Sequence, residues 1–199
     1  MIHTKFETIK KSFDISRQTL NQFIKDENNL ITLFNMAEAL AKSFSLGNKV
    51  LTCGNGGSNC EAVHIAEELT GRYRKDRKAL PALALSEPAY LTCVGNDYGF
   101  DDIFSRGVEA FGKKGDILIA LSTSGNSKNV INAVKTANSK GMDIFSFLGK
   151  TGGALKDKGT FEVLVKAETT DRIQEVHMIC IHILIEATER ILFPENYTT

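Results

Sequence analysis

Apolar residues near the start of the chain recur at intervals of three and four residues in two consecutive segments. The first segment carries Phe6, Ile9, Phe13, Leu20, Phe23 and Ile24. The second carries Leu30, Leu33, Phe34, Ala37, Leu40, Ala41 and Phe44. Such spacing places side chains on one face of a helix. We therefore expect two amphipathic helices within residues 1–46.

Beyond residue 46, short apolar runs alternate with helical patterns. The expected strands cover residues 49–53, 81–85, 116–121, 143–148 and 161–165. The expected helices cover residues 58–73, 90–94, 102–111, 127–139 and 171–192. This alternation indicates a parallel sheet with helices on both faces, the doubly wound α/β class. Because no linker divides the chain, we expect one domain over residues 1–199, with the helical pair at 1–46 and the α/β core at 47–199.

Composition and charge exclude several classes of protein. The 199 residues include 24 Lys plus Arg and 24 Asp plus Glu, without a basic stripe, so a nucleic-acid partner is not expected. The longest apolar stretch, 176–192, is interrupted by charged residues, which argues against a membrane span. The N-terminus lacks the apolar run of a secretory signal. The four cysteines have no CxxC spacing and lie in apolar surroundings, so we expect buried, reduced thiols in a cytoplasmic protein.

Two loops lie where the carboxyl ends of parallel strands bind ligands in this fold class. The first contains Asn55, Gly56 and Gly57, which permit close backbone approach. It lacks the Lys-Ser/Thr of a P-loop and has Asn59 where a dinucleotide fingerprint needs its third glycine, so a nucleotide is disfavoured.

The second loop, STSGNS at 122–127, places four hydroxyls between a buried strand and the start of a helix. They are Ser122, Thr123, Ser124 and Ser127. Hydroxyls and free N–H groups at a helix start suit a phosphate. Alternatively, Ser127 is a helix cap and the other hydroxyls belong to a turn.

Two helices carry groups that could perform chemistry. His64 and Glu68 are four residues apart and share one helix face, so they could bind a metal, pair a base with its orienting partner, or form a surface contact. On the last helix, Gln174 and His182 are eight residues apart, at an offset of about 80°. His177 lies about 140° from His182 by the same geometry. The two histidines therefore cannot serve one site, and we expect His177 to be structural.

Several separated motifs, in order, resemble the phosphoheptose isomerases of the sugar isomerase (SIS) domain superfamily. They are CGNGGS at 53–58, HIAEELTGR at 64–72, VGNDYGF at 94–100, STSGNS at 122–127 and DRIQE at 171–175. The resemblance runs through nearly the whole chain, except that residues 167–170 and the tail after Phe193 match nothing familiar.

The resemblance implies an enzyme that converts sedoheptulose 7-phosphate to D-glycero-D-manno-heptose 7-phosphate, the first step toward ADP-heptose for lipopolysaccharide and other surface polysaccharides. It also implies a homotetramer and one zinc ion per subunit, with no nucleotide. The implied metal ligands are His64, Glu68, Gln174 and His182, with Glu68 and His182 as the catalytic pair. The implied sugar-phosphate ligands are Asn55, Gly56, Gly57, Glu68, Arg72, Asn96, Asp97, Ser122, Thr123, Ser124, Ser127 and Gln174.

The implied chemistry fits these residue types. Interconversion of a ketose and an aldose through an enediol needs a base at carbon 1, a proton shuttle between two oxygens and stabilisation of the intermediate, which a carboxylate, an imidazole and a Lewis acid supply. The alternative is a non-catalytic SIS-fold binding protein of the DnaA initiator-associating type. Such relatives lack the carboxylate and the final histidine, whereas Glu68 and His182 are both present here. A sugar-phosphate-sensing regulator would be expected to carry a DNA-binding segment, for which the first two helices show no sign.

Overall fold

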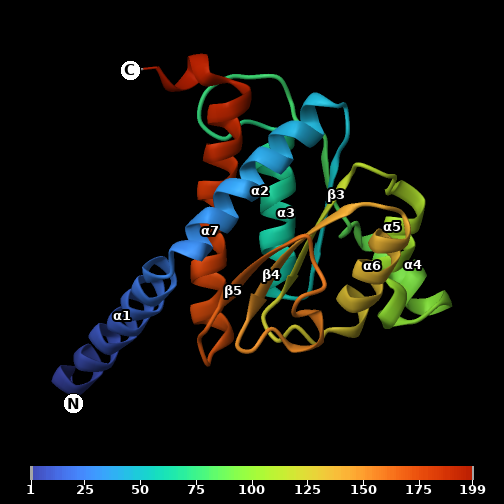
Figure 1. The fold of residues 1–199 in the computed structure, drawn as a ribbon. Helices are drawn as coiled ribbons and strands as arrows, with labels where there is room; N and C mark the ends of the chain where they lie inside the picture. The colour runs from blue at the N-terminus through green and yellow to red at the C-terminus, as the bar shows by residue number, and fades with distance from the viewer. Residues whose placement is uncertain (1, 199) are drawn as a thin grey trace.

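Two long helices precede the sheet. In the computed structural model, which describes residues 2–198, α1 spans Ile2–Lys25 and α2 spans Glu27–Ser45. Asp26 separates them, and its carboxylate accepts the backbone N–H of Asn28, which caps the start of α2. Figure 1 shows α1 leaving the body of the molecule, whereas α2 lies across it.

The core is a five-stranded parallel sheet. Its strands are β1 (Val50–Gly54), β2 (Ala82–Ala84), β3 (Ile117–Ser122), β4 (Asp143–Gly149) and β5 (Phe161–Val165). The spatial order is β2-β1-β3-β4-β5, with every neighbouring pair parallel. The chain therefore leaves β1 toward one edge and β3 toward the other, and the crevice between the ends of these two strands is where such folds bind ligands.

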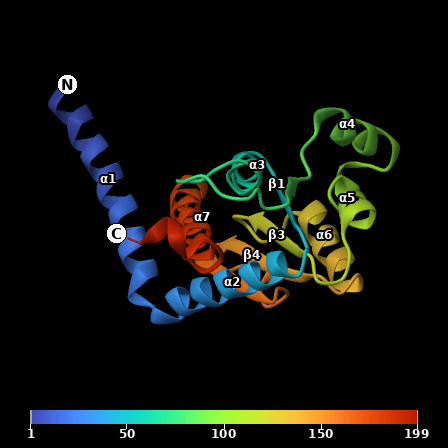
Figure 2. The same ribbon diagram turned by 90° about the horizontal axis from the view of Figure 1, so that it is seen from above.

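Helices cover both faces of the sheet (Figure 2). They are α3 (Gly57–Thr70), α4 (Pro88–Asp97), α5 (Ser105–Phe111), α6 (Lys128–Ser139) and α7 (Thr170–Leu192), with 3-10 turns at Phe100–Asp102, Gly153–Leu155 and Pro194–Tyr197. Alternate strand residues point to opposite faces. Thus Phe145 and Phe147 pack with α2, α3 and α7, whereas Ile144 and Leu148 pack in the core beneath α4, α5 and α6.

The predicted α/β class, the parallel sheet and the pair of N-terminal helices are confirmed. The helix expected at 58–73 ends earlier, at Thr70, where the Gly71 N–H closes the last turn on the Glu67 carbonyl. The helix expected at 102–111 is a 3-10 turn followed by the shorter α5. Among the helices of residues 2–198, none has the length and apolar character needed to cross a membrane.

The prediction for the cysteines was right in one respect and wrong in another. All four thiols are free, as expected. Cys53 and Cys180 are buried, but Cys60 and Cys93 are exposed. The error arose because Cys60 and Cys93 lie on the outward faces of α3 and α4, which an apolar local sequence does not reveal.

Candidate functional site

The loop between β1 and α3 approaches the start of α7 very closely. Gly56 has a φ of 55°, a left-handed conformation that favours glycine. A Cβ atom on Gly57 would lie 2.6 Å from the side-chain amide of Gln174 on α7. The Gln174 amide in turn donates to the Ser58 hydroxyl at 3.3 Å. The glycines are therefore needed to bring backbone N–H groups of this loop next to α7.

The loop between β3 and α6 lies beside the first one. The hydroxyls of Ser122 and Ser127 are 3.1 Å apart. The side chains of Asn55 and Asn129 exchange two hydrogen bonds of 2.9 Å, which join the glycine loop to the first turn of α6. These contacts hold the two loops in a fixed relation across the crevice between β1 and β3.

A cavity of about 310 Å³ lies between the two loops. It is lined by Asn55, Gly56, Gly57, Ser58, Leu121, Ser122, Thr123, Ser127, Thr170 and Gln174. Residues from the starts of α3 and α7, and Ser127 just before α6, contribute to this wall, so free N–H groups and positive helix-dipole ends lie around it. The lining includes hydroxyls and amides but no cationic side chain. Such a surface suits a phosphate group.

Seven of the predicted substrate ligands therefore line one cavity. The other five, Glu68, Arg72, Asn96, Asp97 and Ser124, do not line it. The Ser124 hydroxyl accepts the N–H of Asn126 within its own turn, and Arg72 is exposed beyond the end of α3. Asn96 and Asp97 are exposed at the end of α4 and bond to each other at 2.7 Å. Figure 2 shows α4 and α7 well apart on the two sides of the molecule.

His64, Glu68 and His182 come together between α3 and α7. One potential ligand atom from each residue lies within 4.8 Å of the others. The two Nε2 atoms of His64 and His182 are 2.9 Å apart, and His64 Nε2 lies 3.6 Å from a Glu68 carboxylate oxygen. All three side chains are partly buried. His64 and Glu68 share one face of α3, as their four-residue spacing predicted, and both lie close to His182 on α7.

Two further residues hold the histidines and were not predicted. His64 Nδ1 lies 2.9 Å from a carboxylate oxygen of Glu67. The ring of Tyr73 stacks on that of His182, with centroids 6.1 Å apart and planes inclined by 29°. The three-residue spacing of His64 and Glu67 was a usable signal. Nothing in the sequence indicated the contact of Tyr73, which lies in the loop after α3.

The surroundings of Glu68 make it a stronger base than an ordinary carboxylate. Burial raises the pKa of Glu68, and the charge of Glu67 adds to this effect, while His64 and His182 oppose it.

Another carboxyl on α3, Glu61, is 3% exposed, and neither of its oxygens has a hydrogen-bond partner among the described residues. Burial raises the pKa of Glu61 to about 7.

His177 is separate from this cluster, as the helical geometry predicted. Its ring is fully buried, with Nε2 2.9 Å from the Leu148 carbonyl oxygen and a T-shaped contact to Phe147. Burial lowers the pKa of His177 to about 4, so the ring is neutral near pH 7. These contacts make His177 a packing residue.

The donor set of the cluster fits zinc. Two imidazoles and a carboxylate are ligands that zinc accepts, and ligands around a tetrahedral zinc ion lie about 3.3 Å apart, given bonds of about 2.0 to 2.1 Å. The separations of 2.9 and 3.6 Å from His64 Nε2 lie on either side of this spacing. A carboxylate of Glu67 behind His64 is the outer hydrogen bond that metal-bound histidines usually make. The Gln174 amide contacts Ser58 rather than the cluster.

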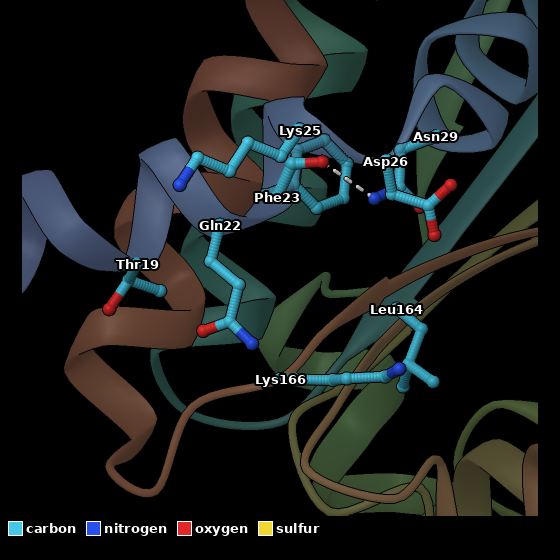
Figure 3. Close-up of a pocket in the computed structure, with 8 residues that line it drawn as sticks. All are labelled: Thr19, Gln22, Phe23, Lys25, Asp26, Asn29, Leu164 and Lys166. Atoms are coloured by element: carbon cyan, nitrogen blue, oxygen red, sulfur yellow. Dashed lines mark hydrogen bonds between the residues drawn. The ribbon is translucent and has the colours of Figure 1, made fainter.

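A larger hollow of about 570 Å³ lies elsewhere, at the junction of α1 and α2 (Figure 3). It is lined by Thr19, Gln22, Phe23, Lys25, Asp26, Asn29, Leu164 and Lys166. Its carboxylate, Asp26, caps α2, and the Asn29 amide donates to the Phe23 carbonyl at 2.8 Å. These polar groups serve the bend between the helices, and the hollow lacks a histidine or cysteine. The cluster of two histidines and a carboxylate lies instead between α3 and α7.

Known proteins resemble this chain in both sequence and structure. Residues 13–149 match the family model of the SIS domain. A phosphoheptose isomerase from Fusobacterium nucleatum is 52% identical over 186 residues, covering 94% of this chain and 96% of the relative. A phosphoheptose isomerase structure from Francisella tularensis superimposes with a TM-score of 0.89 at 33% identity, covering 94% and 98% of the two chains. One from Neisseria gonorrhoeae gives 0.83 at 38% identity, covering 92% and 97%.

Proposed function

The chain belongs to the phosphoheptose isomerase family of SIS-domain proteins, and on this premise we propose that it converts sedoheptulose 7-phosphate into D-glycero-D-manno-heptose 7-phosphate. It is a sugar-phosphate isomerase that acts at the first step of heptose biosynthesis. The non-catalytic alternative lacks support, because both Glu68 and His182 are present and face the same partner, His64.

The spacing between the phosphate cavity and the Glu68–His182 cluster carries this proposal. Both lie along α3, and the six residues from Ser58 to His64 advance about 9 Å along a helix. An open-chain heptose 7-phosphate spans roughly 10 Å from carbon 1 to phosphorus, given single bonds of about 1.5 Å. A seven-carbon sugar with its phosphate in the cavity would therefore place carbon 1 near His64, whose Nε2 is 3.6 Å from the Glu68 carboxylate, whereas a triose phosphate would not reach.

In the proposed reaction, Glu68 removes a proton from carbon 1 of the ketose. The electrons of that C–H bond form the double bond between carbons 1 and 2, while His182 donates a proton to the oxygen on carbon 2. The resulting enediol then loses the proton of its carbon 1 hydroxyl to His182 and takes a proton at carbon 2 from Glu68, which yields the aldose. The raised pKa of Glu68 suits this exchange, since a base and its conjugate acid are both needed.

We propose zinc as the cofactor, held by His64, Glu68 and His182, with Gln174 added as the fourth ligand on the basis of the family motifs alone. Zinc, when bound, supplies a Lewis acid that polarises the carbonyl and stabilises the enediolate. The two-histidine and carboxylate donor set supports this choice. In the same proposal Glu67 orients His64, and the ring of Tyr73 supports His182.

The phosphate is proposed to bind in the cavity between the two loops. Asn55, Gly56, Gly57, Ser122, Thr123, Ser127 and Gln174 would contact it or the adjoining hydroxyls of the sugar. Arg72, Asn96, Asp97 and Ser124 are proposed as further substrate ligands on the basis of the family motifs. Arg72, Asn96 and Asp97 are exposed, and Ser124 is partly buried.

We also propose that residues 1–199 form a single domain that assembles as a homotetramer in the cytoplasm. The support for assembly is the set of exposed apolar side chains on α1 and α2. Phe13 is 74% exposed and Phe34 57%. Side chains of α2 belong to the same core as the strands, which supports one domain rather than two. Four free cysteines suit a reducing compartment.

The direct test is to incubate the purified protein with sedoheptulose 7-phosphate and to follow the products by mass spectrometry and proton NMR. We expect a product of equal mass whose spectrum shows an aldose phosphate. Fructose 6-phosphate, which has six carbons, is the control substrate and should turn over much more slowly. An absence of any aldose phosphate from the seven-carbon ketose would overturn the proposal.

A further inference from the structure

Arg77 forms a buried ion pair next to the proposed active site. It lies in the loop between α3 and β2, and its Nε donates to Glu189 Oε1 on α7 at 2.6 Å. Both side chains are only 1% exposed. Two charges are rarely removed from water unless most of their hydrogen-bonding groups find partners. The partners of Arg77 therefore indicate what the pair does.

The remaining donors of Arg77 bind the carboxyl end of α3. Nη2 donates to the carbonyl oxygen of Glu68 at 2.7 Å, and Nη1 donates to those of Leu69 and Gly71 at 2.9 and 3.0 Å. The last carbonyls of a helix have no partner within the helix. Arg77 thus satisfies the end of α3, and one of its bonds goes to the backbone of the proposed catalytic base itself.

The carboxylate of Glu189 ties this group to α7. Glu189 follows His182 by seven residues, two helical turns, so the two side chains lie on the same side of α7. Its second oxygen, Oε2, accepts the Tyr197 hydroxyl at 2.8 Å. The neighbouring Asn196 donates to the Asp76 carbonyl at 3.0 Å. The 3-10 turn after α7 therefore folds back and fastens both Glu189 and the loop that carries Arg77.

We propose that Arg77, held by Glu189 and Tyr197, is a positioning residue that fixes Glu68 on α3 relative to His182 on α7. The two proposed catalytic side chains come from different helices, and their reaction requires a separation held to within about half an ångström. A guanidinium that bonds the Glu68 carbonyl and a carboxylate of α7 at once supplies a rigid connection between them. The inference rests on the proposed function of Glu68 and His182.

The alternative is that the pair contributes only to stability, and a set of variants separates the two roles. Arg77→Lys keeps the charge but cannot bond Glu189 and three carbonyls together. The double variant Arg77→Met/Glu189→Met replaces both charges by apolar groups, which often preserves stability at buried pairs. Tyr197→Phe removes one hydroxyl and tests the network with little risk to folding.

The matched control is Lys49→Met. Lys49 pairs with the fully buried Asp116 at 2.5 Å, and this pair lies at the amino ends of β1 and β3, away from the proposed site. Its loss should lower the urea midpoint without touching the geometry of Glu68. It therefore reports what a loss of stability alone does to turnover.

kcat and KM for sedoheptulose 7-phosphate are measured for every variant beside its urea midpoint. We expect kcat to fall at least tenfold in Arg77→Lys and in the Met/Met variant, and two- to fivefold in Tyr197→Phe, with KM within threefold of wild type. Lys49→Met should keep kcat within twofold. If the Met/Met variant and Tyr197→Phe retain wild-type kcat, the network is structural only. An inactive wild type would contradict the proposed function instead, so the two failures are distinguishable.

Discussion

The Nε2 atoms of His64 and His182 are 2.9 Å apart, although the two residues are separated by 118 positions in the sequence. One of the two must donate a proton to the other at this distance. His64 Nδ1 is paired with the Glu67 carboxylate, which is an acceptor, so the His64 proton lies on Nδ1 and its Nε2 is the acceptor. When no metal is bound, His182 is therefore the donor through Nε2, and His64 Nε2 has the lone pair. A metal held by both histidines would displace the proton from His182 Nε2, because a ligating imidazole nitrogen must offer a lone pair.

The first prediction concerns the metal. We expect purified protein to contain zinc and to lose activity in a strong chelator, with recovery on addition of zinc, because His64, Glu68 and His182 form a zinc-type donor set. Metal content is measured by mass spectrometry alongside turnover. His64→Ala should reduce zinc content, whereas His177→Asn, a change remote from the cluster, should not. Full activity in metal-free protein would remove zinc from the mechanism and leave the acid–base pair.

The second prediction concerns the phosphate cavity. Replacing Ser122 and Ser127 together by Ala should weaken binding of inorganic phosphate and of substrate by about 100-fold or more, since each hydrogen bond to a charged group contributes roughly 1.5 to 3 kcal/mol. Binding is measured by calorimetry.

The control for this pair is Ser139→Ala at the far end of α6. The Ser139 hydroxyl donates only to the Thr136 carbonyl, so its loss should leave affinity unchanged. Equal phosphate affinity in the double variant and the wild type would place the phosphate elsewhere.

The third prediction concerns assembly. Light scattering at micromolar concentration should give about 88 kDa, the mass of four chains of 21.9 kDa. Phe13→Glu combined with Phe34→Glu should lower this mass, because both side chains are exposed on α1 and α2 in the protomer. Lys11→Glu, an exposed change on α1, serves as the control. A monomeric wild type would contradict the prediction.

The fourth prediction concerns Glu61 and pH. Because folding raises its pKa from 4.5 to about 7, Glu61 favours the folded state below pH 4.5, and this stability is lost as the pH rises through about 7. The loss is on the order of 3 kcal/mol, at 1.36 kcal/mol per pKa unit. Glu61→Gln removes the titration. Its free energy of unfolding, compared with that of wild type, should therefore improve by this amount between pH 4 and pH 8.

Urea unfolding of both proteins at the two pH values measures this difference. His177, whose pKa is lowered by burial, titrates in both proteins, so its contribution cancels in the comparison. A difference between the two proteins that does not change with pH would show that Glu61 is not a buried acid.

Local patterns were sufficient to predict most elements of the fold. The strand expected at 161–165 is β5 with the same bounds, because its apolar run is sharply delimited. The strand order β2-β1-β3-β4-β5 could not be obtained in this way, since it depends on pairing between distant segments. Periodicity likewise separated His177 from His182 but could not show which helix His182 faces.

The candidate site was predictable only in part for the same reason. The four-residue spacing of His64 and Glu68 placed both on one face of α3, but their meeting with His182 required the packing of α7 on α3. That pairing was anticipated through the family motifs rather than through spacing. The stacking of Tyr73 and the contacts of Arg77 depend on how the loop after α3 folds back, which no local pattern specifies.

The last prediction tests the mechanism by separating proton removal from substrate binding at Glu68. Glu68→Gln keeps the shape of the side chain and an oxygen that can face a metal, but it removes the basicity needed at carbon 1. We expect near-normal affinity with turnover reduced roughly 100-fold or more, the usual contribution of a positioned general base. Glu67→Gln is the matched control on the neighbouring residue and should reduce turnover less, since Glu67 acts only through its contact with His64 and through its charge beside Glu68.

Heavy water distinguishes the possible roles of Glu68, because a carboxylic acid formed during the reaction can exchange its proton with solvent while the enediol persists. Wild type should therefore introduce deuterium at the reprotonated carbon, and Glu68→Gln should lose interconversion and exchange together. Exchange at the wild-type rate in the variant would show that Glu68 is not the base and would favour His182. Weakened affinity with unchanged single-turnover chemistry at saturation would instead make Glu68 a ligand alone, because only binding would then depend on its charge.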